Sequence, residues 1–211
     1  MTTRIGLISD VHSSPDALAE ALDIFAAEQV DDIICAGDIA GYYDTLLPTV
    51  ELLIESNCRA IVGNHDQKWL DKDPEQQHPL IRDYLRALPQ TLQLQIEGVR
   101  LFAVHANPPS EQHGGIKLRN RDGEIEQQRK AEWLDRLAEF DHDVLIVGHT
   151  HQVFAERLGG TLVINPGSVP FNHSCMILSL PDLGVETFPL GGREIVNCWN
   201  FSMVFGEQGD G

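Results

Sequence analysis

Cysteine is sparse in this 211-residue chain, and no two cysteines are close in sequence. The four are Cys35, Cys58, Cys175 and Cys198, and no C-x-x-C pair occurs. Secreted disulfide scaffolds and structural zinc-thiolate sites both need clustered or regularly spaced cysteines. The spacing therefore argues against both kinds of site, and the cysteine usage fits a reducing cytoplasm.

Long apolar runs are also absent. No run approaches the roughly 20 residues that a membrane-spanning helix needs. The N-terminus enters a predicted strand at once, with Arg4 as its only early basic residue, so we expect no signal peptide. These features predict a cytoplasmic protein with no membrane partner.

Basic residues are also few relative to acidic residues. Lys and Arg total 15 against 32 Asp and Glu, which gives a formal net charge of −17. Nucleic-acid backbones and anionic membranes are bound by clustered Lys and Arg. The charge balance therefore argues against an extended nucleic-acid footprint and against an anionic membrane surface.

The first part of the chain contains short apolar segments that alternate with amphipathic helical patterns. The predicted strands and helices follow one another over residues 4–9, 14–28, 32–36, 45–55 and 59–62. Ser14 is the predicted N-cap of the first helix, and Pro15 occupies its first position. Three strands separated by helices indicate a parallel α/β arrangement.

The rest of the chain is richer in strands. We predict a helix over 79–88, a hairpin of 92–96 and 100–104, a polar surface loop or lid over 110–122, a helix over 124–140 with Trp133, Leu134 and Leu137 inward, and a buried strand over 144–147. Short antiparallel strands follow at 153–157, 162–164, 175–180 and 185–188, with a tight turn at 165–168 between two of them. For residues 193–205 we favour a final strand over a helix.

These elements predict one domain over residues 1–205, with a disordered tail over 206–211. The fold class is α/β, as a four-layer αββα sandwich in which two packed mixed β-sheets are flanked by helices.

Residues that can bind metals follow five of the predicted strands. They are Asp10 and His12, Asp38, Asn64 and His65, His105, and His149 and His151. Ligands of α/β proteins gather at the carboxyl ends of strands. A mixed set of nitrogen and oxygen donors suits two first-row divalent ions, such as Mn, Fe, Ni or Zn, better than Ca or Mg. Asp38 follows the central strand, and a carboxylate bridges two cations best, so Asp38 is the predicted bridge.

The motifs D-x-H, G-D, G-N-H-D, H and G-H-T-H occur in this order, each after a predicted strand. This ordered set resembles the calcineurin-like metallophosphoesterase superfamily, and the resemblance extends to about Ser168. G-D-I-A-G-Y-Y and N-P-G-S look most like the small prokaryotic phosphodiesterase branch of that superfamily. Each motif alone is a weak signal, whereas the full set in its structural context is specific.

The resemblance implies a role for each of these residues. Asp10, His12 and His151 would hold the first metal. Asn64, His105 and His149 would hold the second, and Asp38 would bridge both. His65 would stay unligated and face the substrate.

Other polar residues near the motifs have less defined expectations. Asp66 either orients an imidazole or lies on the surface. His78, His113 and His142 fall outside the pattern and are expected at the surface. His173 follows N-P-G-S, where relatives often carry a basic residue that faces the substrate, although this chain lacks an Arg there.

The expected function is a metal-dependent phosphodiesterase that acts on a small phosphorylated substrate. A hydroxide between the two metals, most favourably Mn, would attack phosphorus in line, with Asp38 and His65 as catalytic residues. One alternative is a phosphomonoesterase acting on nucleotides, phosphoserine or phosphothreonine. Another is a scaffold that has lost the chemistry, as the related retromer subunit has; it ranks last because this chain keeps every ligand and His65. The sequence leaves the oligomeric state open and is compatible with a homo-oligomer.

Overall fold

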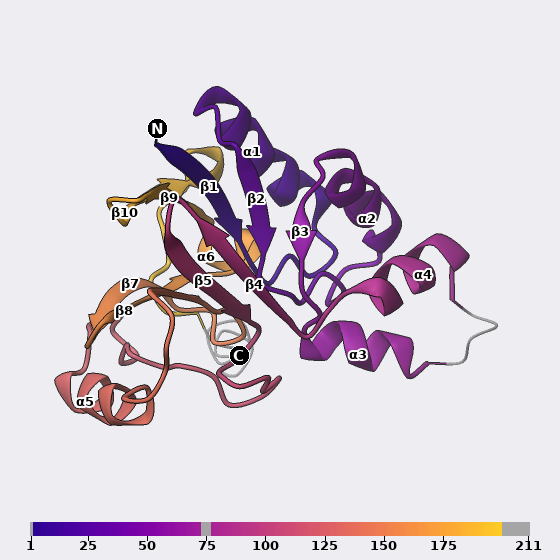
Figure 1. Cartoon of the computed structure of the whole chain (residues 1–211). Helices are drawn as coiled ribbons and strands as arrows, with labels where there is room; N and C mark the ends of the chain where they lie inside the picture. The colour runs from indigo at the N-terminus through magenta and orange to yellow at the C-terminus, as the bar shows by residue number, and fades with distance from the viewer. Residues whose placement is uncertain (1, 73–76, 200–211) are drawn as a thin grey trace, which may run out of the picture.

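Two five-stranded β-sheets lie face to face in the computed structural model, which describes residues 2–72 and 77–199 (Figure 1). The first sheet has the order β10 (Gly184–Pro189), β9 (Ser174–Leu180), β1 (Thr3–Ile8), β2 (Asp32–Cys35) and β3 (Arg59–Ala60). The second has the order β4 (Thr91–Ile96), β5 (Val99–Val104), β6 (Val144–Ile146), β8 (Thr161–Pro166) and β7 (Val153–Leu158). Both sheets mix parallel and antiparallel pairs.

Helices cover the outer faces of the sheets, with α1 and α2 on one side and α5 on the other (Figure 1). Their bounds are α1 Pro15–Ala27, α2 Leu46–Glu55, α3 Asn64–Leu70, α4 Pro79–Ala87, α5 Gln127–Arg136 and α6 Val169–Asn172, with a 3₁₀ helix at Leu190–Gly192. None of the helices in the described part of the chain is long and apolar enough to cross a membrane. The two mixed sheets flanked by helices confirm the predicted αββα architecture.

Three apolar layers hold the sandwich together, because successive side chains of a strand point to opposite faces. In β1, Leu7 packs between the two sheets, whereas its neighbour Ile8 packs under the helices of the first sheet. In β5, Leu101 lies between the sheets and Phe102 lies under α5. A strand that is buried on both faces must be apolar throughout, which is why these segments lack alternation.

The parallel strands place the chemistry at shared edges of the sheets. Strands β1, β2 and β3 run parallel in the first sheet. Strands β5, β6 and β8 run parallel in the second. The loops that leave β1, β2, β3, β5 and β6 therefore emerge at the carboxyl ends of neighbouring strands.

Two short helices were missed in the sequence. No helix was predicted at the G-N-H-D segment that follows the third strand, but α3 begins at Asn64, with Gly63 as its N-cap. The N-P-G-S segment was expected to be a tight turn between two paired strands. It instead leads from β8 into α6 and then to β9, which belongs to the other sheet.

The expected final strand is wrong for the part that the structure describes. Residues 193–199 form no strand, and only Cys198 makes an isolated bridge, to Gln152. The remaining predicted residues, 200–205, and the predicted tail over 206–211 lie outside the described residues. Residues 193–199 contain apolar side chains typical of a strand. Only one of these residues forms a β-bridge with another segment, so no ladder of hydrogen bonds forms.

Two further expectations need correction. The helix predicted over 124–140 is shorter, and Leu134, expected inward, is 44% exposed. The loop over 110–122 has no regular structure, as predicted, but Ile116 and Leu118 are fully buried in the layer under α5. These two buried side chains anchor the loop. In the sequence, an alternation of only three residues is too short to be distinguished from chance.

Candidate metal centre

The five strand ends meet at one place between the two sheets. Backbone hydrogen bonds join the loops directly: Asp10 N–H donates to the Gly37 carbonyl at 2.9 Å, and Gly148 N–H donates to the His105 carbonyl at 2.8 Å. Because each loop is tied to its neighbour, the side chains that follow the strands are held close together.

Left-handed backbone turns aim these side chains at a common point. The φ angles are +51° at Asp10, +49° at His12, +54° at Asp38, +63° at His149 and +48° at His151. Residues other than glycine rarely adopt this conformation, and such strained positions cluster at functional sites. Five left-handed residues at neighbouring strand ends therefore indicate a functional site rather than ordinary turns.

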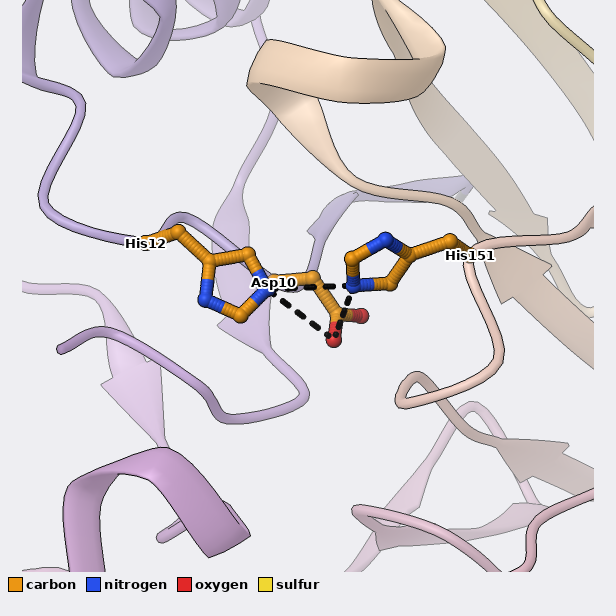
Figure 2. A group of neighbouring side chains, drawn as sticks. All are labelled: Asp10, His12 and His151. Atoms are coloured by element: carbon orange, nitrogen blue, oxygen red, sulfur yellow. Dashed lines mark hydrogen bonds and ion pairs between the residues drawn. The ribbon is translucent and has the colours of Figure 1, made fainter. Parts of the chain in front are cut away.

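Asp10, His12 and His151 form what we call the first donor group. The Asp10 Oδ1 atom lies 3.3 Å from His151 Nε2, and the two imidazole Nε2 atoms are 3.0 Å apart. Figure 2 shows the three side chains pointing toward one another from two different loops. All three are buried, so the donor atoms converge away from bulk water.

Asp38, Asn64, His105 and His149 form the second donor group. His105 Nε2 lies 3.3 Å from Asp38 Oδ1 and 3.0 Å from Asn64 Oδ1. The same Asn64 oxygen lies 2.8 Å from His149 Nδ1. Four side chains from four strand ends therefore present nitrogen or oxygen atoms to one point.

Asp38 lies between the two donor groups. Its carboxylate and one atom each of His105 and His149 lie within 4.8 Å of one another. The Asp38 carboxylate, one atom of His12 from the first donor group and one atom of His65 also lie within 4.8 Å of one another. The structure thus brings together all eight residues that the sequence singled out.

Hydrogen bonds to backbone carbonyls orient the imidazole rings of the donor groups. His105 Nδ1 lies 2.8 Å from the Ala36 carbonyl, and His12 Nδ1 lies 3.3 Å from the Ala40 carbonyl. A carbonyl only accepts, so Nδ1 carries the proton in both rings and Nε2 faces the donor groups. Second partners of this kind fix the tautomer of histidines that bind metals.

Burial and neighbouring charges set the protonation of the site. Burial lowers the pKa of His12 and of His149 to about 4, so both rings are neutral at pH 7. Burial opposes the charged form of His105, but the Asp38 carboxylate prevails and raises its pKa to about 9. In return His105 holds the pKa of Asp38 below its ordinary value, although burial raises it. The partner of the Asp38 carboxylate is thus the proton that His105 gains. A bound cation would take the place of that proton.

The donor chemistry fits divalent metals. Asn64 turns its amide oxygen toward two ring nitrogens, whereas the amide rotated by half a turn would donate hydrogen bonds to both rings and to the Gln112 carbonyl. Only the oxygen-inward orientation offers a lone pair to a cation, so a metal at this point would select it over the rotated amide. Imidazole, carboxylate and amide donors without thiolate match a first-row divalent metal.

Asp66 has neither of the roles that were expected. It is fully buried, and the hydrogen bonds of its carboxylate within the described part of the chain go to backbone N–H groups rather than to an imidazole. Its carboxylate accepts backbone N–H groups from Ala40 at 2.7 Å and Gly63 at 2.8 Å. Burial and the nearby Asp38 raise its pKa to about 7. Asp66 therefore ties the loop after β2 to the start of α3.

The remaining histidines lie outside both donor groups. His78 and His113 are exposed as expected, whereas His142 is half-buried against Phe102 and Phe140. His173 has its Nδ1 atom 3.3 Å from the Glu194 carbonyl and does not line the cavity beside the donor groups.

A cavity of about 250 Å³ opens beside the donor groups. Its walls are formed by Asp38, Tyr42, Asn64, His65, Lys117, His149, Thr150, His151 and Trp199. Sequence reasoning missed Tyr42, Lys117 and Trp199 as site residues. Tyr42 follows the G-D motif closely and Lys117 lies in the loop after His105, so both positions were available as signals, whereas nothing near Trp199 pointed to the site.

This combination defines a class of protein. Two sheets that carry converging imidazole, carboxylate and amide donors at their strand ends, beside an open cavity, are the framework of a metal-dependent hydrolase of the αββα class. The chain belongs to the calcineurin-like phosphoesterase superfamily, whose domain model matches residues 3–180.

Individual relatives agree with this assignment. Phosphodiesterase MJ0936 of Methanocaldococcus jannaschii is 27% identical over 201 residues, which cover 92% of this chain and 98% of the relative. A protein of Methanothermobacter thermautotrophicus named "Probable metallophosphoesterase" is 30% identical over 167 residues, 78% of this chain and 76% of the relative. A metallophosphoesterase structure from Sphaerobacter thermophilus shares the fold with a TM-score of 0.68 and 24% identity, over 90% of this chain and 89% of that one.

Proposed function

We propose that this protein is a phosphodiesterase whose two donor groups hold two divalent cations side by side, with Asp38 shared between them. The position of the Asp38 carboxylate carries the proposal, because it converges with His12 on one side and with His105 and His149 on the other. A carboxylate that bridges two metals needs ligands of both within reach.

The remaining ligands would divide between the cations as the two donor groups do. Asp10, His12 and His151 would hold one cation, and Asn64, His105 and His149 would hold the other. We propose Mn²⁺ for both, in keeping with the mixed nitrogen and oxygen donors. When bound, two such cations would make water a nucleophile near neutral pH and neutralise charge on the phosphoryl group.

His65 and Lys117 supply the contacts that the chain itself makes to substrate. The His65 backbone N–H donates to Asp38 at 2.8 Å, and its ring lines the cavity, with Nε2 3.4 Å from the Tyr42 hydroxyl. From there the imidazole is placed to stabilise phosphoryl oxygens or to give a proton to the leaving alkoxide. Lys117 adds a positive charge to the same cavity, which attracts an anionic ester.

The test is an activity assay on protein of known metal content. Protein stripped by a chelator is reloaded with Mn²⁺, Ni²⁺, Zn²⁺ or Fe²⁺ and assayed on bis(p-nitrophenyl) phosphate and on p-nitrophenyl phosphate. We expect no turnover without metal and a preference for the diester after reloading. The Asp38→Asn variant should lose activity by orders of magnitude, whereas Asp23→Asn, an exposed control on α1, should not.

Two results would contradict the proposal. Hydrolysis of the monoester alone would make the protein a phosphomonoesterase. Binding of two cations without hydrolysis of any ester would make it a scaffold.

A further inference from the structure

Aromatic rings form a continuous row along the cavity beside the donor groups. Tyr42 lies 5.5 Å from Phe171, and Phe171 stacks on Trp199 at 4.2 Å with an interplanar angle of 13°. The Trp199 ring is also 5.1 Å from His151 of the first donor group. The three rings come from the loop after β2, from α6 and from the segment after the 3₁₀ helix. The fold therefore brings three separate segments together to build this row.

Tyr42 is placed as a ligand-binding residue rather than as a core residue. Its side chain is 40% exposed, yet its ring lies 4.7 Å from the His12 ring and 5.0 Å from the His65 ring. Exposed apolar surface next to a polar site is typical of a ligand-binding wall. Tyr42 and Trp199 both line the cavity itself.

Most of the lysines of the chain border the same region. The chain has four lysines, and three of them border this region. Lys117 lines the cavity, and Lys68 and Lys72 line a hollow that shares Tyr42 and His65 with it. In a chain of net charge −17 this placement favours an anion beside the aromatic row.

The size of the cavity limits what can fill it. Its volume of about 250 Å³ is below the roughly 300–1,000 Å³ of pockets that enclose a whole drug-sized ligand. A phosphoryl group at the donor groups leaves room for one further small group. A planar ring is the group that an aromatic wall binds best.

We propose that Tyr42 and Trp199 form a binding subsite for a planar aromatic group carried by the phosphoester, either a nucleobase or an aryl ring. The proposal rests on the proposed phosphoesterase function and names the class of its substrate. The phosphoryl group lies at the end of the cavity beside the donor groups, and the ring lies against the aromatic row at the other end.

Competitive inhibition by three monophosphates that differ only in the ester group tests the subsite. Methyl phosphate, phenyl phosphate and thymidine 5′-monophosphate are compared as inhibitors of diester hydrolysis by the Mn²⁺-loaded protein. We expect the ring-bearing compounds to inhibit at roughly tenfold lower concentration than methyl phosphate, the order of one stacking contact. An advantage for both assigns the subsite to any planar ring, and an advantage for thymidine 5′-monophosphate alone assigns it to a nucleobase.

Variants separate stacking from support of the fold. In Tyr42→Leu and Trp199→Leu the advantage of the ring should shrink to about threefold or less, while methyl phosphate inhibits as before. Tyr42→Phe should keep the advantage, because it keeps the ring. Tyr43→Leu is the matched control, since Tyr43 is 47% exposed, lines a different hollow and has its ring 6.3 Å from Phe171, farther than the Tyr42 ring.

A binding measurement keeps this test independent of turnover. Thymidine 5′-monophosphate should change the tryptophan fluorescence of the Mn²⁺-loaded protein, and the change should be lost in Trp199→Leu, which retains Trp69 and Trp133. Equal inhibition by all three compounds, or an equal loss of all three in the Leu variants, would overturn the subsite. Failure of every diester as a substrate would instead refute the phosphodiesterase, while the fluorescence result still decides the subsite.

Discussion

At the scale of single residues, His65 has a different environment from the other imidazoles of the site. It is half-buried, lines both the cavity and the hollow beside it, and has Tyr42 as a neighbour. Its Nε2 atom lies 3.4 Å from the Tyr42 hydroxyl, and both residues line the cavity. The ligand roles assigned to Asp10, His12 and His151 do not depend on it.

We predict that His65→Ala keeps both cations and lowers turnover, because the lost contact is made mainly in the transition state. If His65 is a general acid, the loss is larger for an alkyl diester than for an aryl diester, whose leaving group needs no proton. If His65 only stabilises the charge of the phosphoryl group, the loss of turnover is nearly the same for the alkyl and the aryl diester. The measurements are turnover on both esters and metal content by elemental analysis, with His78→Ala as an exposed control. Loss of a cation in His65→Ala would show that His65 is a ligand.

Asp66 acts on the backbone rather than on the substrate. We predict that Asp66→Asn lowers the free energy of unfolding by about 1–3 kcal/mol, because the amide nitrogen would face the N–H of either Ala40 or Gly63 in a buried site. Chemical denaturation measures the change, and Asp23→Asn serves as the exposed control. An unchanged midpoint would show that the two loops are held by other contacts.

At the scale of elements, the site depends on how closely the strand-end loops approach one another. A Cβ on Gly63 would lie 2.2 Å from Asp38 Oδ1 and 2.3 Å from the Asp38 backbone nitrogen. A Cβ on Gly148 would lie 1.9 Å from Ser9 Oγ and 2.7 Å from Asp10 Oδ2. The glycines of the motifs are therefore required by close packing of one loop against the next.

Gly63→Ala should displace Asp38 and with it the shared ligand of the two donor groups. We predict loss of at least one cation and of most activity, measured by elemental analysis and by diester turnover. Gly160→Ala is the matched control, because a Cβ there meets nothing within 4 Å. Full metal content in Gly63→Ala would mean that the loop after β2 can shift without losing its function.

The loop over 110–122 presents one charged side chain to the cavity between two buried anchors. Ile116 and Leu118 are fully buried, and Lys117 between them lines the cavity. The alternation of burial over three residues fixes the direction of Lys117. We therefore expect this loop to influence substrate binding more than the chemical step.

Lys117→Met keeps the length of the side chain but removes the charge. It should raise KM for an anionic diester several-fold with little change in kcat or in metal content, and the difference from wild type should shrink as salt is added. Arg121→Met, an exposed change in the same loop, should leave KM unaltered. A fall in kcat at constant KM would place Lys117 in the chemical step instead.

At the scale of the whole molecule, local patterns predicted most of the architecture. All ten strands found in residues 2–72 and 77–199 were predicted within a few residues, because apolar strands and amphipathic helices differ in period. The pairing of β8 with β6 and of β9 with β1 was not predicted, since sheet membership depends on contacts between residues far apart in sequence. The same reason explains the error over residues 193–199.

The candidate ligands were predictable for a related reason. Asp10, Asp38 and His105 each follow a strand, so parallel topology alone places them at neighbouring sheet edges. Trp199 reaches the cavity only through the packing of a distant segment, which no local pattern reveals, whereas Tyr42 lies within the G-D-I-A-G-Y-Y motif. Whether the predicted domain over 1–205 is a single unit stays a prediction.

The central claim is that two cations share Asp38, and anomalous scattering from crystals of the Mn²⁺-loaded protein tests it most directly. We predict two peaks roughly 3.5–4 Å apart, a spacing typical of two-metal hydrolases. Asp38 should contact both, with Asp10, His12 and His151 around one and Asn64, His105 and His149 around the other. A single peak, or two peaks that Asp38 does not touch, would contradict the account.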